Sequence, residues 1–184
     1  MLYLLDANTL INPHDTYYGM DCVPEFWSWM EFQARKNIYR IPPMIYQEIQ
    51  PKSEEFRQWL YRNKRILILK EDENYALIRN VISEGYGNKI TDVQLKRIGA
   101  DPFLIASALE DSQGRCVVTN EVSKLTAKGA KRKIPDICDQ LNVKWISMVD
   151  FIKVHGFKTR WKSEISPSDL EKYSGHHQSQ LFDA

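Results

Sequence analysis

Cysteine, net charge and long apolar runs are all scarce in this chain of 184 residues. The three cysteines (Cys22, Cys116 and Cys138) lie far apart, without CxxC spacing or nearby paired histidines. This pattern disfavours a zinc site and predicts buried free thiols in a reducing compartment. The formal net charge is only +1, so no overall basic field points to nucleic acid, although clustered acids can offset basic residues elsewhere.

A secretory signal has a basic region before its apolar residues, and the N-terminal segment of this chain lacks one. No stretch approaches the roughly 20 apolar residues that span a bilayer. We therefore expect a cytoplasmic protein with no membrane contact. Hydrophobic residues make up 43% of the chain and charged residues 27%, which is ordinary globular composition.

The length fits a single domain with a substantial core. We expect this domain to cover residues 1–155, because from about Gly156 the chain turns polar. Residues 156–184 are predicted to form a peripheral C-terminal extension.

Short apolar runs alternate with helical patterns along the chain. Buried strands are predicted at 2–5, 66–69, 115–119 and 144–147. Helices are predicted at 24–37, 44–50, 54–65, 74–84, 91–97, 101–109, 135–141 and 148–155, with a turn at 12–15 and a basic loop at 123–133. Strands that alternate with helices favour an α/β fold in which a central parallel sheet carries helices on both faces.

Four acids occupy comparable places in this pattern. Asp6 ends the first strand and Glu121 follows the strand at 115–119. Glu48 lies in the helix after Pro42-Pro43, and Asp101 begins an apolar helix. In a parallel sheet, the strand ends and the starts of the following helices share one edge, so these carboxylates could converge there.

Each acid also has a purely structural interpretation. Asp101 before Pro102 is a plausible N-cap, and Asp6 could cap the turn through Asn8. Glu48 and Glu121 alone are ordinary solvated charges.

If the acids converge, each raises the pKa of the others, and a cation would stabilise them. Oxygen ligands without Cys or His favour Mg²⁺ or Mn²⁺ over zinc. Such sites commonly serve phosphodiester hydrolysis.

The four segments together resemble the successive motifs of PIN domains, from about residue 2 to residue 151. They are Leu5–Ile11, Pro43–Ile49, Ala100–Ala108 and Val117–Glu121. The resemblance is closest to a subgroup with Leu-Asp-Ala-Asn and Lys-Ile-Pro-Asp-Ile-Cys stretches. It implies a three-layer α/β/α PIN-like fold and a nuclease that uses acids to hold Mg²⁺ or Mn²⁺ and cut RNA. Many members are toxins of type II toxin–antitoxin pairs, of the virulence-associated-protein-C type.

Carried over by motif, Asp6, Glu48 and Asp101 match the three core metal-binding acids. Glu121 stands where a fourth acid, often Asp, follows the strand, and the resemblance implies that its longer side chain acts through a water or a second metal ion. Asn8 and Thr119 match polar positions that support the acids by hydrogen bonding.

Two further features border this set. Asp136 is a candidate additional acid, with a charge at a helix N-terminus as the equally good alternative. The basic run beyond Glu121 consists of Lys124, Lys128, Lys131, Arg132 and Lys133. We consider these residues as contacts to the RNA backbone, Lys124, Lys131 and Arg132 above all; a solvated surface is the alternative.

The sequence thus predicts a metal-dependent endoribonuclease, held inactive by a cognate antitoxin. The aromatic segment Phe26–Phe32 is a candidate surface for the antitoxin or for a homo-oligomer, with core packing as the default. A catalytically inactive PIN-like module that binds RNA or protein is the alternative function. A phosphatase with Asp6 as nucleophile is disfavoured, because enzymes of the haloacid dehalogenase type need a second Asp where this chain has Asn8.

Overall fold

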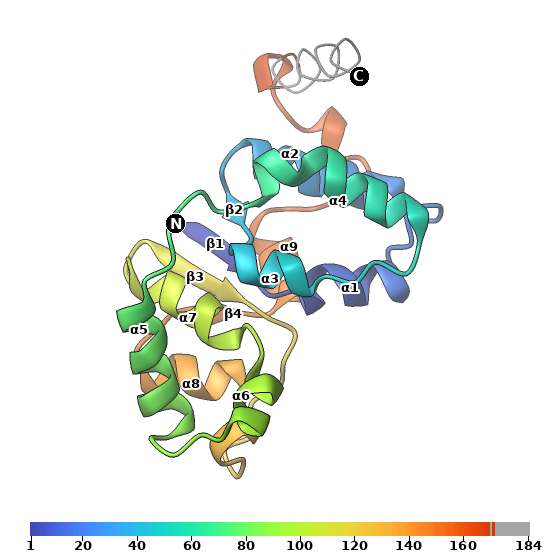
Figure 1. The fold of residues 1–184 in the computed structure, drawn as a ribbon. Coiled ribbons are helices and arrows are strands. Elements are labelled where there is room, and N and C mark those ends of the chain that lie inside the picture. The colour runs from blue at the N-terminus through green and yellow to red at the C-terminus, as the bar shows by residue number, and fades with distance from the viewer. Residues whose placement is uncertain (170, 172–184) are drawn as a thin grey trace.

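A four-stranded parallel sheet forms the centre of the computed structural model, which describes residues 1–169 and 171 (Figure 1). The strand order is β2-β1-β3-β4. The strands are β1 (Leu2–Leu5), β2 (Tyr39–Arg40), β3 (Arg115–Val118) and β4 (Trp145–Ile146). All the pairings between them are parallel. The predicted α/β class with a parallel sheet is confirmed.

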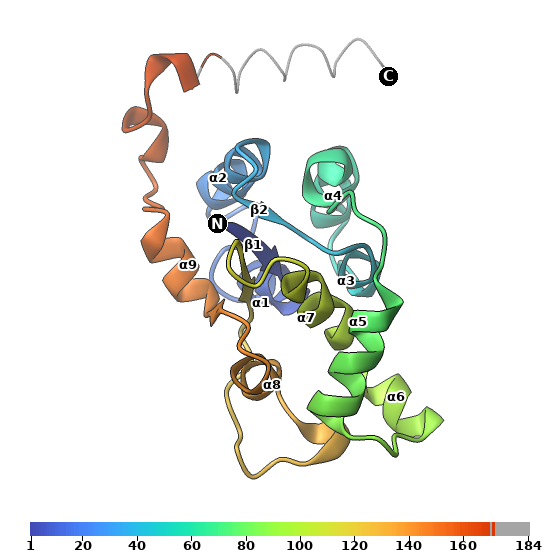
Figure 2. The same cartoon turned by 90° about the vertical axis from the view of Figure 1, so that its left-hand side faces the viewer.

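Helices cover both faces of this sheet. Figure 2 shows α9 on one side of it and α7 with α3 and α5 on the other. The helices are α1 (Asn8–Asp15), α2 (Pro24–Arg35), α3 (Pro43–Glu48), α4 (Glu54–Leu67), α5 (Tyr75–Asn80), α6 (Asp92–Ile98), α7 (Asp101–Leu109), α8 (Ile134–Gln140) and α9 (Met148–Val154). Shorter turns are the π-helical η1 (Val81–Tyr86) and the 3-10 helices η2 (Gly129–Lys131) and η3 (Trp161–Ser163).

The two central strands are buried because helices cover both of their faces. Leu4 and Leu5 of β1, and Val117 and Val118 of β3, are all 0% exposed. The register pairs Leu5 with Val118, so the residues that follow these two strands leave the sheet side by side. This pairing brings the Asp6 and Thr119 segments together.

The turn predicted at residues 12–15 is wrong, because α1 continues through it with Pro13 inside the helix. Proline lacks the N–H that a helix interior uses, so it normally predicts a break. Here Thr9, Leu10 and Pro13 are all buried. Packing against the core therefore outweighs the local cost of the proline.

The strand predicted at residues 66–69 is also wrong. Helix α4 runs on to Leu67, and only an isolated bridge joins Ile68 to Ile41. A short apolar run fits a strand and a buried helix end equally well. The edge strand is instead β2, whose two residues are too few to give a periodic signal.

The aromatic segment Phe26–Phe32 packs into the core. Phe26, Trp29 and Met30 are at most 2% exposed, so core packing is confirmed for this stripe. Of the three cysteines, Cys116 and Cys138 are buried as expected, but Cys22 is exposed, because it lies in the loop before α2.

The first part of the C-terminal extension packs against α2. The Phe157 ring packs edge-on against the Phe26 ring, with 5.4 Å between the ring centroids. The Trp161 indole Nε1 donates to the Glu25 carbonyl at 3.0 Å. Residues 170 and 172–184 of the predicted extension lie outside the described residues. No helix in the described part has the length and apolar character of a membrane span.

Candidate active site at the carboxyl edge of the sheet

Asp6 follows β1 directly and is only 4% exposed. Its backbone N–H donates to the Val118 carbonyl at 2.9 Å, which extends the ladder between the central strands by one residue. The carboxylate atom Oδ2 accepts a hydrogen bond from the Thr119 hydroxyl at 3.0 Å. Burial, with a smaller contribution from the charge of Glu121, raises the pKa of Asp6 to about 6. Asp6 is therefore a poorly hydrated carboxyl group with a fixed orientation.

Asp101 is the first helical residue of α7, and the preceding Ala100 occupies the N-cap position. The Asp101 side chain makes no capping hydrogen bond, so the interpretation of Asp101 as the N-cap is wrong. The Tyr86 hydroxyl lies 3.4 Å from Oδ2 of Asp101. Burial raises the pKa of Asp101 well above its ordinary value, and the charges of Asp6, Glu121 and Glu48 raise it further, in that order. The four predicted acids therefore act on one another electrostatically.

Glu48 is the last residue of α3, which packs against α7. Its Oε1 atom accepts a hydrogen bond from the Ala100 backbone N–H at 2.7 Å. The neighbouring Gly99 has φ +61°, and a Cβ atom there would lie 2.6 Å from the same oxygen. Glycine at position 99 thus allows both the chain reversal into α7 and the close approach of Glu48.

Glu121 has both carboxylate oxygens engaged at the start of α8. Oε1 accepts from the Lys133 ammonium at 2.5 Å, and Oε2 accepts from the Ile134 N–H at 2.8 Å. Its own backbone N–H donates to the Thr119 hydroxyl oxygen at 3.1 Å. Thr119 thus contacts Asp6 and the Glu121 backbone together.

The predicted supporting residues Asn8 and Asp136 have different surroundings. Asn8 is exposed at the start of α1, and its carbonyl accepts from the Asn120 side chain at 3.2 Å. Asp136 is 5% exposed, and it accepts from the Ser123 hydroxyl at 2.5 Å and from the Lys124 N–H at 2.9 Å. Asp136 therefore fastens the basic loop to α8.

The three basic residues singled out as RNA contacts also differ. The Arg132 guanidinium is bonded within the protein, to the Gly85 carbonyl, the Gln140 side chain and the Asp136 carbonyl. Lys124 and Lys131 are exposed. The lysines are free to meet a ligand, whereas Arg132 ties η1 to α8.

The donor set suits a hard cation, since it consists of carboxylate oxygens. Among the described residues, however, no group of three or more Asp, Glu, His or Cys side chains is arranged as a metal site. Glu48 and Glu121 are instead satisfied by N–H donors. Asp6 accepts the Thr119 hydroxyl bond and backbone hydrogen bonds from Ala7 and Asn8, and Asp101 accepts the Tyr86 hydroxyl bond.

Tyr86, a neighbour of Asp101, was missing from the prediction, and Lys133 was predicted only as part of the basic run and not as a partner of Glu121. Tyr86 lies between two glycines at the end of a helical pattern, where nothing in the sequence indicates a contact with Asp101. Lys133 belongs to the basic run beyond Glu121. Lys133 stands immediately before Ile134-Pro135, where the proline marks a helix start, and this position is the sequence signal that could have distinguished Lys133 from the other basic residues of the run.

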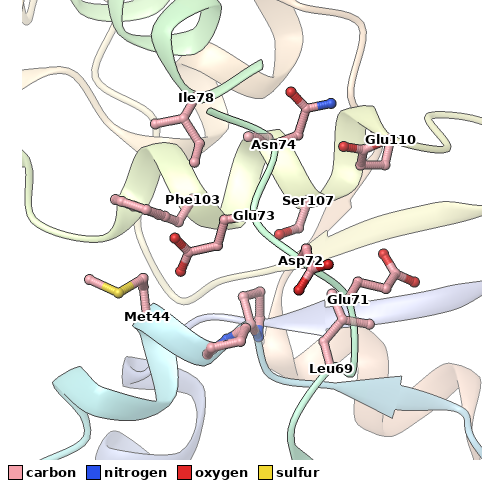
Figure 3. A pocket seen from close by; sticks show the side chains of 13 residues that line it. Met44, Leu69, Glu71, Asp72, Glu73, Asn74, Ile78, Phe103, Ser107 and Glu110 are labelled. Atoms are coloured by element: carbon pink, nitrogen blue, oxygen red, sulfur yellow. The ribbon is translucent and has the colours of Figure 1, made fainter. Parts of the chain in front are cut away.

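A hollow of about 380 Å³, partly open to solvent, lies away from these acids, between α3, α5 and α7. In Figure 3, Phe103 and Met44 lie on one side of it, with Asp72 and Ser107 nearer its centre. Its rim carries Glu71, which pairs with Arg115 at 2.7 Å. None of the four predicted site acids lines this hollow.

The fold and the acid edge define the class of this molecule as an α/β protein with a carboxylate-rich sheet edge. The sequence matches the family described as "Domain of unknown function (DUF4411)" over residues 3–159, and the chain belongs to that family. No curated protein and no solved structure matches the chain. The family match covers all four acids and the supporting Thr119.

Proposed function

We propose that this protein is a metal-dependent endoribonuclease that hydrolyses RNA phosphodiester bonds. The observation that carries the proposal is the Asp101 carboxyl, whose pKa is raised well above its ordinary value by burial and by Asp6, Glu121 and Glu48. Carboxylates held close together repel one another unless cations neutralise them, and Lys133 pairs with Glu121 alone among the four acids. A dense set of carboxylates therefore supports a binding site better than it supports a structural role.

The donor chemistry fits Mg²⁺ or Mn²⁺, which when bound would polarise a phosphate oxygen and lower the pKa of a water. Asp6 and Asp101 are the residues that would hold the ion. Thr119 orients Asp6 through its hydroxyl group. Glu48 and Glu121, which already accept backbone N–H bonds, would contribute through water.

The central experiment compares RNA cleavage by the full chain with cleavage by Asp6→Asn and Asp101→Asn, in Mg²⁺ or Mn²⁺. We expect each substitution to lower the rate by more than about a hundredfold. Asp72→Asn is the matched control, because it removes an exposed carboxylate at the hollow between α3, α5 and α7, which none of the four acids lines. Absence of cleavage by the unsubstituted chain, or equal rates in all variants, would refute the nuclease proposal.

We further propose that the enzyme is a toxin whose partner is an antitoxin protein; the PIN-domain resemblance supports this role. Induced expression in a bacterial host should arrest growth with the unsubstituted chain and not with Asp6→Asn, at matched protein levels. Unimpaired growth with abundant, active enzyme would contradict the toxin role and leave the nuclease proposal standing.

The second candidate is a catalytically inactive module that binds RNA or protein. Two observations favour it: both oxygens of Glu121 are bonded at the start of α8, and among the described residues no group of three or more acids is arranged for a metal ion. The same assay decides between the two, since an inactive module would bind RNA without metal-dependent cleavage.

A further inference from the structure

Lys133 places a positive charge at the edge of the acid cluster. It precedes α8, and its Nζ atom lies 2.5 Å from Oε1 of Glu121. The Lys133 side chain is 39% exposed, whereas that of Glu121 is 19% exposed. The Lys133 side chain therefore contacts Glu121 through its ammonium group and is partly open to solvent.

Glu121 does not depend on Lys133 alone for its position. Its second oxygen accepts the Ile134 N–H at 2.8 Å, and its backbone N–H is bonded to Thr119. Two of its three anchors would thus remain if the Lys133 side chain turned to another anion. A rotatable ammonium on a flexible stem can exchange one oxygen partner for another at little cost when both are anionic.

The electrostatic surroundings keep this ammonium charged. The hydrogen bond to Glu121 and the charges of Glu121 and Asp101 raise the pKa of Lys133, against opposing effects of burial and of the positive charge on Arg97. Arg97, whose charge is the smallest of these effects, is a second cation in this part of the chain. Arg97 lies near the end of α6, which packs against η2 in the loop before Lys133 (Figure 1).

Arg97 is exposed, and no ion pair joins it to another residue in the part of the chain that the structure describes. Lys133 at the start of α8 contacts Glu121, and Arg97 lies on α6, which packs against η2 in the loop that leads to Lys133. Lys and Arg side chains that face solvent next to a negatively charged site are suited to phosphate oxygens.

We propose that Lys133, together with Arg97, binds a backbone phosphate of the RNA at the acid edge. This inference rests on the proposed nuclease function for its ligand class. The phosphate takes the place of the Glu121 oxygen at the Lys133 ammonium, while Glu121 stays bonded to Ile134. Lys133 is then a substrate-binding residue as well as the partner of Glu121.

The test measures binding of a short, fluorescein-labelled single-stranded RNA by anisotropy, in EDTA and over a salt series. We expect Lys133→Met to weaken binding about five- to tenfold and to reduce the salt slope by about one. Arg97→Met should act in the same direction, and Lys133→Arg should retain most of the affinity. Lys153→Met is the matched control, because Lys153 is an exposed lysine on α9, which Figure 2 shows on the side of the sheet opposite α7.

A second comparison separates substrate binding from a role limited to holding Glu121. In a Glu121→Gln background, Lys133→Met should still weaken RNA binding by a similar factor. If the second substitution has no effect there, Lys133 serves only Glu121 and the inference is overturned. Unfolding midpoints recorded on the same samples ensure that each variant is compared in its folded state.

The outcomes also distinguish this inference from the nuclease proposal. Metal-dependent cleavage that requires Asp6, with RNA binding unaffected by Lys133→Met, overturns the phosphate contact alone. RNA binding that depends on Lys133, without any cleavage, refutes the nuclease and leaves the contact standing. Absence of RNA binding by the unsubstituted chain at low salt overturns the contact as well.

Discussion

The Thr119 hydroxyl donates to Asp6 Oδ2 at 3.0 Å, although the two residues are 113 positions apart in the sequence. The bond exists because β1 and β3 pair in parallel with Leu5 opposite Val118. The next residue of each strand then leaves the sheet at the same edge. Both side chains are buried, at 4% and 0% exposure, so neither has water as an alternative partner.

Thr119→Val should destabilise the protein, because it removes this donor while keeping the side-chain shape. A buried carboxyl that loses one hydrogen-bond donor costs about 1–3 kcal/mol in the free energy of unfolding. The loss should be greater at pH 8 than at pH 5, since the charged form of Asp6 most needs the donor. Urea unfolding measures it, with Thr119→Ser as the conservative variant and the exposed Thr126→Val as the control. Equal loss in both valine variants would contradict the assigned contact.

The raised pKa of Asp6 predicts a specific pH dependence of stability. In the folded chain it is about 6, against an ordinary value of 3.8. Between these values the folded state keeps a proton that the unfolded state has released. Stability should therefore fall as pH rises through this window and remain lower above it, by about 2–3 kcal/mol for Asp6 alone.

Asp6→Asn should abolish this part of the decline, so that the variant gains on the unsubstituted chain as pH rises. The measurement is urea unfolding in EDTA at about pH 4.5 and about pH 7.5. Asp72→Asn, which changes an exposed carboxylate, should follow the unsubstituted profile. If the stability of Asp6→Asn and that of the unsubstituted chain changed in parallel with pH, the pKa of Asp6 would not be raised in the folded state.

Gly99→Ala should lower both stability and activity. The residue has φ +61°, and the added Cβ would come within 2.6 Å of Glu48 Oε1, so the change strains the backbone and displaces an acid. We expect a loss of about 2 kcal/mol in thermal unfolding. Gly156→Ala is the control, since its φ is +66° with nothing within 4 Å of the added atom. Equal losses at both positions would mean that the contact with Glu48 adds nothing.

Asp136→Asn should weaken the attachment of the basic loop without removing a catalytic group. Burial alone would raise the pKa of Asp136, but hydrogen bonds from Ser123 and from the Lys124 and Lys133 backbones hold it below its ordinary value. Its stabilising effect is therefore present above the ordinary pKa and is lost as pH falls through the lower, folded value. The amide cannot accept at both positions, so the loss should be about 1–2 kcal/mol.

Limited proteolysis of the loop at 120–133 and an RNA cleavage assay check this prediction together. We expect faster loop cleavage by the protease and a cleavage rate on RNA within a few fold of the unsubstituted chain. A collapse of RNA cleavage with an unchanged loop would instead make Asp136 part of the active site, which is the other interpretation of its position.

The central strands could be predicted because buried parallel strands have continuous apolar runs, and both Leu2–Leu5 and Arg115–Val118 have them. The capped helix α6 was equally clear, since Thr91 and Gln94 form a reciprocal capping box. Local sequence pattern gave the wrong secondary structure where tertiary packing outweighs local preference, as in α1, which contains Pro13. It also failed at residues 66–69, where a short apolar run could end a helix or form a strand.

For the candidate site, local pattern placed Asp6 after a strand and Asp101 before a helix, and a parallel sheet then implied a shared edge. Local sequence pattern could not predict the hydrogen-bond partners of these acids. Nothing near Tyr86 in the sequence points to Asp101, and nothing near Ala100 points to Glu48, 52 positions away. Such contacts depend on how α3, α7 and η1 pack, which involves residues far apart in the chain.

The sequence by itself determined the alternation of strands and helices and the acids that mark their ends, because apolar periodicity and helix-start signals are local. Only the tertiary structure decided that the four acids act on one another, that the Arg132 guanidinium is bonded within the protein, and that the Lys133 side chain contacts Glu121 while partly open to solvent. The physical reason is that burial and pairing depend on distances between separate elements. Local pattern fixes which residues are available, and packing fixes which of them meet.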